Sequence, residues 1–454
     1  NSCSSGTGAK RWACQSALAC SIRSGEDETK FQKIWRFSGS GSPALIADAQ
    51  RGSASIMTAR AQVFAARAAL AGADSATLPQ VALEAGAYRG VSASAPLGTG
   101  MNAGLQASWA LDVWGRNASS VRQASAQVAA AQAGWHEARV LMAAETARLY
   151  LGWRSCLAQK AVIDSDRASR SVTAQSAADT ERAGLLAPAT AALARAGQAD
   201  AESRLAQQNR QCEQQFKAIV ALVGADEPRM RERLGTATAL PDPTVAGSVL
   251  KVAAVPLEVI RQRPDVARAQ QELVAAAEGV GVARAALWPS LSLTGNLLRN
   301  RFTTGGESTT FNTWSAGPLT LNLPLIGRAG LNASSEAASA RYEAAALGYA
   351  NVLRRAIAEV EQSLVALEAL RTQLAASQQA VAGYTRSFEA TEARYRVGLA
   401  NLNELEEARR LKLNADSGAV ALQLDHLNTW IALYVALGGG FDPQIAPEPV
   451  RKDS

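Results

Sequence analysis

Residues Met101–Arg116 read MNAGLQASWALDVWGR, and two periodicities meet within this stretch. From Met101 to Val113, apolar or small side chains alternate with polar or small ones, and this period of two predicts a β-strand. The run is longer than the usual strand of a soluble protein and is typical of a strand that crosses a membrane in a barrel, with apolar side chains outward. After Gly115-Arg116 the alternation stops, so we predict that a strand gives way to a helix here.

Apolar residues recur at every seventh position after this junction. They are Val121, Val128, Trp135, Met142, Leu149, Cys156 and Ile163. This uninterrupted heptad series predicts one long helix that packs as a coiled coil and runs to about Arg182. Gly184 to Pro188 then predicts a turn, after which an Ala-rich helix returns to about Val223.

The same plan recurs in the second half of the chain. LPLIGR at Leu323–Arg328 stands where LDVWGR stands at Leu111–Arg116. Alternating residues from Ser290 precede it, and a second heptad series follows it. The second series is Leu353, Val360, Leu367, Leu374, Val381, Phe388 and Tyr395. The chain is therefore two copies of one unit, which consists of a helix, two strands, a very long helix, a turn and a return helix.

This repeat divides the chain into segments and predicts a fold that is mainly α with membrane β. We expect a leader over 1–43, a first repeat over 44–224, a connecting segment over 225–256, a second repeat over 257–440 and a tail over 441–454. Strands are expected at about 80–113 and 290–323, and long helical hairpins at about 117–223 and 329–437. We also expect one helix over Leu45–Leu78 and polar loops at Gly90–Gly100 and Arg299–Thr310. The connecting segment is either a linker or a small mixed domain outside the helices.

Both copies of the junction carry a glycine followed by an arginine. We predict that Gly115 and Gly327 allow the chain to bend between strand and helix. Arg116 and Arg328 are expected on the aqueous side of this boundary between strand and helix.

Composition excludes several classes of function. The 454 residues carry a formal net charge of +6, and their basic residues are scattered, without the basic tract of a nucleic-acid-binding protein. The 2 histidines and 5 cysteines have no zinc-site spacing, and no nucleophile or phosphate-binding motif occurs. We therefore expect no enzymatic activity, no cofactor and no metal. No apolar run reaches the roughly 18 residues of a transmembrane helix, so a membrane crossing is expected to use strands.

The cysteines raise two separate possibilities. Arg11–Cys20 (RWACQSALAC) resembles the end of a secretion signal, so Cys20 is a possible lipidation site, although Ala17 stands where a lipoprotein signal has a branched apolar residue. The alternative is a disordered or processed leader. Cys156 and Cys212 lie at similar distances from the first turn, so an antiparallel hairpin places them at nearly equal height. They are expected either to form a disulfide in an oxidising compartment or to fill small core positions as free thiols.

Four strands cannot close a membrane barrel. An open sheet edge cannot remain in lipid, because its backbone groups would have no hydrogen-bond partners. Bacterial barrels have about eight strands or more, so two such subunits would reach the lower limit and three would exceed it. The Ala-rich hairpins likewise need neighbours against which to bury their apolar faces. We therefore predict an oligomer.

Several short motifs carry a family resemblance. RQRPD at Arg261–Asp265, ARAALWPSLSLTG at Ala283–Gly295, LPLIGR and RYRVGL at Arg394–Leu399 resemble outer membrane factors, the TolC-like channel proteins. The resemblance covers about Leu45 to Phe441 and is greatest to the branch that serves resistance-nodulation-division efflux pumps. It implies a homotrimer with a barrel of about twelve strands in the bacterial outer membrane. It also implies a long α-helical tunnel that extends into the periplasm.

The resemblance also implies partners and sites. The partners are a periplasmic adaptor (membrane fusion) protein, an inner-membrane transporter, which is a proton-driven pump or an ABC exporter, and outer-membrane lipid. The turn residues expected at the adaptor-docking tips are Gly184, Leu185, Gly398 and Leu399, where the simpler alternative is that glycine ends a helix. Glu404 and Glu407 take the places of acidic residues in the family's second turn and are possible tunnel-mouth acids. Their alternative role is that of a solvated helix start favoured by the helix dipole.

Three functions remain open at this point. Passive exit of drugs or other small molecules from a tripartite efflux system is favoured by the resemblance to one branch. Type I secretion of a protein toxin uses the same architecture. A periplasmic coiled-coil adaptor or scaffold belongs to a different class, and the alternating strand runs argue against it.

Overall fold

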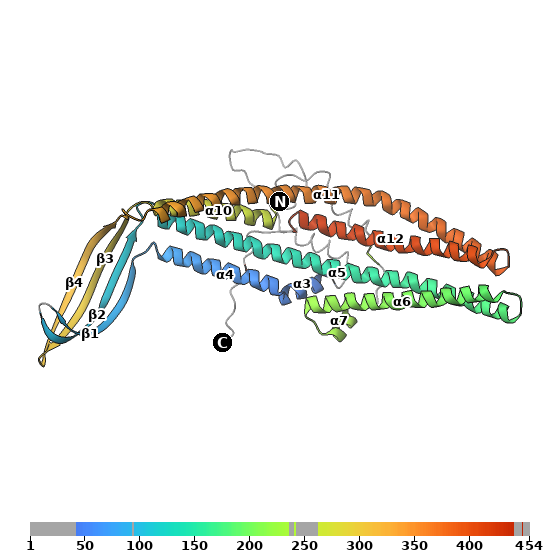
Figure 1. Ribbon diagram of the computed structural model, residues 1–454, viewed down its shortest axis with the longest axis horizontal. Helices are drawn as coiled ribbons and strands as arrows, with labels where there is room; N and C mark the ends of the chain where they lie inside the picture. Colours follow the sequence, from blue (N-terminus) through green and yellow to red (C-terminus); the bar gives the residue numbers. More distant parts are fainter. Residues whose placement is uncertain (1–41, 93–94, 236–239, 242–261, 440–446, 448–454) are drawn as a thin grey trace, which may run out of the picture. The chain divides into compact units, whose positions relative to one another are not determined.

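The computed structural model describes residues 42–92, 95–235, 240–241, 262–439 and 447. In chain order the elements are α3 (Ser42–Gly52), α4 (Ala54–Ser75), β1 (Gln80–Ser92), β2 (Ala95–Leu111), α5 (Arg116–Arg182), α6 (Pro188–Val223), α7 (Glu227–Leu234), α10 (Pro264–Ala285), β3 (Ser290–Thr304), β4 (Glu307–Asn322), α11 (Ala329–Arg396) and α12 (Leu402–Ala436) (Figure 1). The predicted mainly helical fold with four strands is confirmed, and the two long helices contain 67 and 68 residues. Cys20 lies outside the described residues, as do almost all of the leader and of the tail.

Each of two compact units takes part of both sequence repeats. Unit 1 contains Asn1–Ala54, Arg139–Ile260 and Ile357–Asp442. Unit 2 contains Ser55–Ala138, Arg261–Ala356 and Pro443–Ser454, and it therefore includes the four strands. The long helices α5 and α11 contribute to both units. In the part of the chain that the structure describes, no helix is both long and apolar enough to cross a membrane.

The strands of unit 2 form one antiparallel sheet in the order β1-β2-β3-β4. Residues paired directly across neighbouring strands share a face of the sheet. One face therefore carries the row Leu83, Leu105, Leu297 and Trp314. The adjacent row, on the other face, contains Ala82, Gln106, Asn296 and Ser315. We call these the apolar face and the polar face.

The apolar face of the sheet is uncovered in the single chain. Leu83 is 76% exposed and Trp314 is 78% exposed, although both belong to an apolar row. The outer strands β1 and β4 each pair on one side only, so each leaves a row of backbone groups without a partner strand. These exposed features need a partner or a lipid environment to become stable.

Two predicted loops are wrong, because the described strands extend into them. β1 extends to Ser92 and β2 starts at Ala95, within the loop expected at Gly90–Gly100. β3 extends to Thr304 and β4 starts at Glu307, within the loop expected at Arg299–Thr310. The threonines of the second segment are polar but favour strands, and the ladder of paired residues continues to a tight turn at Gly305 and Gly306.

The helix expected over Leu45–Leu78 is interrupted, because α3 ends at Gly52 and α4 begins at Ala54. Glycine weakens a helix, and a Cβ at this position would lie 3.3 Å from the carbonyl oxygen of Val223. The connecting segment contains one described helix, α7, whose apolar residues Met230 and Leu234 are buried against the hairpin of α5 and α6. Most of the remaining connecting segment lies outside the described residues.

The helices of unit 1 pack through the predicted apolar series. Every residue of both heptad series, in unit 1 and in unit 2, is buried or half-buried. The largest core cluster of unit 1 consists of Leu45, Ala49, Tyr150, Trp153, Phe216, Ile219, Val223, Met230 and Leu234. Full burial of one such large side chain contributes about 1.5–3 kcal/mol, so this cluster stabilises the meeting point of α3, α5, α6 and α7.

A disulfide links α5 and α6 within unit 1. Cys156 and Cys212 are bonded, their Cα atoms are 5.5 Å apart, and each residue is 5% exposed. Gln208 Nε2 donates a hydrogen bond to the carbonyl oxygen of Cys156 at 3.2 Å, which ties the same two helices together. The structure thus adopts the disulfide, the first of the two alternatives that the sequence left open.

Candidate functional site

The junction between sheet and helix is built around two glycines with left-handed backbone. Gly115 has a φ of 72° and Gly327 has a φ of 84°, values that residues with a Cβ rarely adopt. Asp112 precedes the first glycine and caps α5, since its carboxylate accepts hydrogen bonds from the backbone N–H groups of Asn117 at 3.0 Å and Ala118 at 2.8 Å. The sequence interpretation missed this capping role, although an aspartate before a helix start is its usual sign.

Both junctions contact the short segment that precedes β3. The rings of Trp114 and Trp288 stack with centroids 5.0 Å apart, and Trp114 Nε1 donates to the carbonyl oxygen of Pro289 at 2.7 Å. Arg328 Nη2 donates to the carbonyl oxygen of Leu287 at 3.0 Å. Arg116 is exposed. The segments that follow β2 and β4 therefore both contact the segment that precedes β3. The aqueous location of the two arginines stays a prediction.

Both helical hairpins of unit 1 turn through the same Schellman motif. In the first hairpin, Leu185 N donates to Thr180 O at 3.0 Å and Gly184 N donates to Glu181 O at 2.9 Å. In the second, Leu399 N donates to Arg394 O at 2.8 Å and Gly398 N donates to Tyr395 O at 3.0 Å. The two glycines have φ values of 72° and 75°. The four turn residues singled out in the sequence thus occupy equivalent positions.

The leucines of these turns project into solvent. Leu185 is 79% exposed and Leu399 is 70% exposed. A hydrophobic residue at this position of a Schellman motif commonly packs against the preceding turn of its own helix. Exposure of the leucine at the equivalent position in both turns makes these tips candidates for contact with another protein.

Glu404 and Glu407 have local partners. Asn401 is the N-cap of α12, because its Oδ1 accepts from the backbone N–H of Glu404 at 2.9 Å, and its Nδ2 donates to the Glu404 carboxylate at 2.7 Å. Glu407 pairs with Arg410 at 2.7 Å, and the hydrogen bond from this arginine lowers the pKa of the Glu407 carboxyl. Glu404 thus lies in the first turn of α12, as the alternative interpretation expected. A role at a tunnel mouth stays a prediction for both glutamates.

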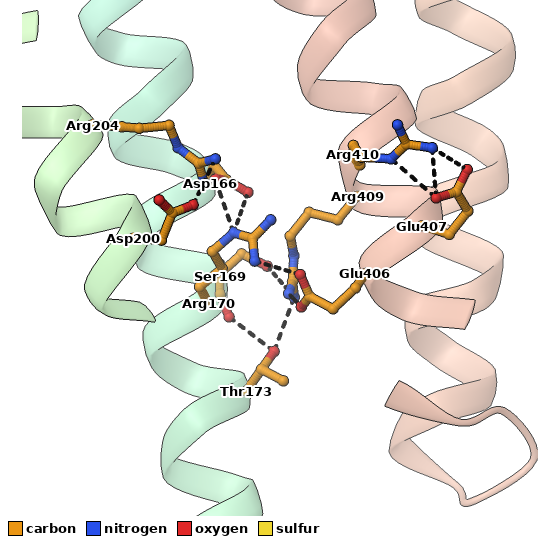
Figure 2. A network of polar contacts seen from close by, with 10 residues as sticks. All are labelled: Asp166, Ser169, Arg170, Thr173, Asp200, Arg204, Glu406, Glu407, Arg409 and Arg410. Carbon is orange, nitrogen blue, oxygen red and sulfur yellow. Dashed lines mark hydrogen bonds and ion pairs between the residues drawn. The ribbon is translucent and has the colours of Figure 1, made fainter. Parts of the chain in front are cut away.

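A network of charged and hydroxyl side chains joins the two hairpins within unit 1 (Figure 2). Its members are Asp166, Ser169, Arg170 and Thr173 of α5, Asp200 and Arg204 of α6, and Glu406 and Arg409 of α12. Arg170 Nε donates to Asp166 at 3.0 Å, and its Nη1 donates to Glu406 of the other hairpin. Arg409 pairs with Glu406 and also donates from Nη2 to Ser169 Oγ at 3.1 Å and Thr173 Oγ1 at 2.9 Å. We call this group the inter-hairpin network.

The centre of the inter-hairpin network is buried. The side chains of Asp166 and Arg409 are 4% and 3% exposed. Burial lowers the pKa of the Arg409 guanidinium, and the negative charge of Glu406 opposes that shift. Three arginines face three carboxylates, so the group is neutral as a whole. Loss of one partner from such a buried set leaves an uncompensated charge.

The sequence interpretation missed this network, although the apolar spacing contains a sign of it. Arg170 stands seven residues after Ile163, at the next position of the first heptad series, where an apolar residue is expected. Arg409 follows the buried Leu402 and Leu405 at helical spacing. Charged residues at core positions indicate a polar contact between helices. No group of acidic, histidine or cysteine side chains in the described ranges is placed to hold a metal ion.

A model of the family described as outer membrane efflux protein matches residues 45–225 and 255–439. The chain is 27% identical over 350 residues to the solvent efflux pump outer membrane protein SrpC of Pseudomonas putida, which covers 74% of this chain and 71% of that protein. It is 29% identical over 344 residues to the outer membrane protein OprJ of Pseudomonas aeruginosa, which covers 73% of this chain and 68% of that protein. The fold is similar to the crystal structure of the CmeC outer membrane channel of Campylobacter jejuni. That comparison has a TM-score of 0.78 and 22% identity, and it covers 90% of this chain and 88% of that one.

Proposed function

This chain belongs to the outer membrane efflux protein family, and from that membership we propose that it is the exit channel of a tripartite export system. It lies in the bacterial outer membrane and extends into the periplasm. It conducts substrates passively, and transport is energised by its partners. Among cargoes, small molecules are favoured, because the relatives named above include a solvent efflux component.

The observation that carries this proposal is the sheet of unit 2. Its apolar face is exposed and its two outer strands lack partners on one side. In lipid, an apolar face is stable but an open edge is not, because hydrocarbon supplies no hydrogen bonds. Pairing of β1 of one subunit with β4 of the next removes every open edge. Three subunits then form a closed barrel of about twelve strands, within the range of bacterial barrels.

Cell fractionation and efflux assays test the proposed function together. The protein is expected in detergent extracts of the outer membrane as an oligomer. Deletion of its gene is expected to increase accumulation of a fluorescent pump substrate, and the wild-type gene should restore export. Recovery in the soluble periplasmic fraction would contradict the channel and favour a scaffold. The inner-membrane transporter that co-purifies distinguishes small-molecule efflux by a proton-driven pump from protein secretion by an ABC exporter.

The exposed hairpin tips are the proposed docking points for the periplasmic adaptor. Leu185 and Leu399 are accessible and lie at equivalent positions, and each is held by its own Schellman motif. Two rigid apolar side chains at the end of polar helices suit insertion into an apolar recess of a partner. Both leucines belong to unit 1, so the proposed adaptor contact involves no residue of the sheet.

We expect the double substitution Leu185→Ser and Leu399→Ser to weaken adaptor binding by roughly 10- to 100-fold, because two exposed apolar anchors are removed. The melting temperature should not change, since neither side chain is buried. Binding of the purified adaptor measures the effect. Val365→Ser is the matched control, because Val365 is 72% exposed on α11, far from both turns. Equal weakening by the control would show that the tips have no special role.

A further inference from the structure

Three arginines lie on the apolar face of the sheet near its hairpin turns. Arg299 and Arg301 of β3 pair directly with Ala103 and Met101 of β2, so they share the face of Leu105 and Leu297. Arg89 of β1 pairs with Thr99 of β2 and is therefore on the same face. All three arginines are exposed. We call these residues the arginine cluster.

The arginine cluster has no acidic counterpart on its own face. The acidic residues of the four strands are Glu84 and Glu307. Glu84 pairs with Gly104, in a row of the polar face, and Glu307 pairs with Thr304, also on the polar face. The side chain of Arg301 donates to Ser308 Oγ at 3.4 Å, which leaves its positive charge uncompensated.

The arginine cluster stands where the apolar band of the sheet ends. From Leu111 to Met101 the β2 strand rises about 33 Å, or about 25 Å across a membrane at the usual strand tilt, which matches the apolar band of known barrels. Arg301 is paired with Met101 at the end of this band. The next row of paired residues on the same face, toward the hairpin turns, consists of Arg89, Thr99, Thr303 and Ser308. Long arginine side chains at this depth reach the headgroup region while their stems stay in contact with apolar residues.

We propose that the arginine cluster binds the phosphate groups of an anionic lipid in the outer leaflet of the outer membrane. This inference rests on the proposed function, which places the helices in the periplasm and hence the hairpin turns at the outer surface. Guanidinium groups bind phosphate through paired, charge-assisted hydrogen bonds, and the hydroxyl groups of Thr99 and Thr303 add donors in the Arg89 row.

The neighbouring side chains favour a lipid over a free anion. Ala87 and Met101 occupy the Arg301 row, and Ala85 and Ala103 occupy the Arg299 row. These small and apolar residues provide a surface for acyl chains directly beside the charges. A ligand that fits both features carries phosphate and hydrocarbon together, as phosphorylated glycolipids of a bacterial outer leaflet do.

Titration of the purified full-length oligomer in detergent with lipid A carrying two phosphates tests the proposal. The triple variant Arg89→Gln, Arg299→Gln and Arg301→Gln is expected to bind lipid A roughly a hundredfold more weakly. Each arginine near a charged membrane surface contributes a similar factor to the binding affinity, and the variant loses all three. Wild-type protein should likewise bind lipid A without phosphates far more weakly. Inorganic phosphate should not compete at millimolar concentration.

A matched control replaces three exposed arginines of α11, Arg354, Arg371 and Arg386, with glutamine. This control should bind lipid A like the wild type. Equal affinity of the wild type for both forms of lipid A, or equal binding by the two triple variants, would overturn the proposal. Competition by inorganic phosphate would indicate a free-anion site and overturn it as well. If the arginine variant does not assemble, the comparison of the two lipids on wild-type protein still decides. Absence of the wild-type protein from the outer membrane would instead refute the proposed function.

Discussion

Replacement of Arg409 with leucine is expected to lower the free energy of unfolding of unit 1 by about 3–5 kcal/mol, because it leaves the buried inter-hairpin network with one uncompensated negative charge. The guanidinium also donates to Ser169 and Thr173 of the other hairpin, so the same substitution removes two of the hydrogen bonds between the hairpins. Denaturant titration of the purified protein, monitored by circular dichroism, measures the change.

The neighbouring arginine provides the control for this prediction. Arg410 pairs with Glu407 on the exposed surface of the same helix, and its substitution by leucine should leave the denaturation midpoint unchanged. The double substitution Arg409→Leu and Glu406→Leu should recover much of the loss, because an apolar pair avoids the cost of an unpaired charge. Equal effects of the Arg409 and Arg410 substitutions would show that the inter-hairpin network does not stabilise the fold.

Removal of the disulfide is expected to lower the free energy of unfolding by about 4 kcal/mol, the loop-closure value for Cys156 and Cys212 at a sequence separation of 56. The single variants Cys156→Ala and Cys212→Ala and the double variant should lose the same amount, because each breaks the same bond. Addition of a reducing agent to the wild type should reproduce the loss. Denaturant titration measures the free energy of unfolding of the three variants and of the wild type with and without reductant. Losses that add in the double variant would indicate two independent buried thiols instead.

Most of the fold was predictable because burial leaves a local period in the sequence. The alternation over Met101–Val113 indicates a strand with one apolar face, and the heptads over 121–163 indicate a helix with one apolar face. Both elements occur where expected. The ends of the strands were not predictable in this way. At Arg299–Thr310 both faces carry polar residues near the water boundary, so the alternation disappears although the hydrogen-bonded ladder continues.

The candidate sites were predictable only in part. The turns at Gly184 and Gly398 were found because a glycine with left-handed backbone ends a helix in a recognisable way. The inter-hairpin network was missed because its contacts join Arg170 and Glu406, which no sequence spacing relates. The arginine cluster likewise depends on the register between strands, which places Arg89 and Arg301 on one face.

Disulfide cross-linking between the outer strands tests the channel most directly. With the three N-terminal cysteines replaced by serine, one new cysteine replaces Ala85 in β1. A second replaces, one at a time, residues on the same face along β4, because tilted strands shift the register between subunits by several residues. These residues are Ser308, Thr310, Asn312, Trp314, Ala316 and Leu319. Side chains opposite each other on paired strands have Cβ atoms about 4.5–5.5 Å apart, close enough for a bond after small adjustments. If β1 of one subunit pairs with β4 of the next, one member of the series will give a covalent trimer on a non-reducing denaturing gel. Monomer bands alone across the whole series, from protein extracted from the outer membrane, would contradict the shared barrel.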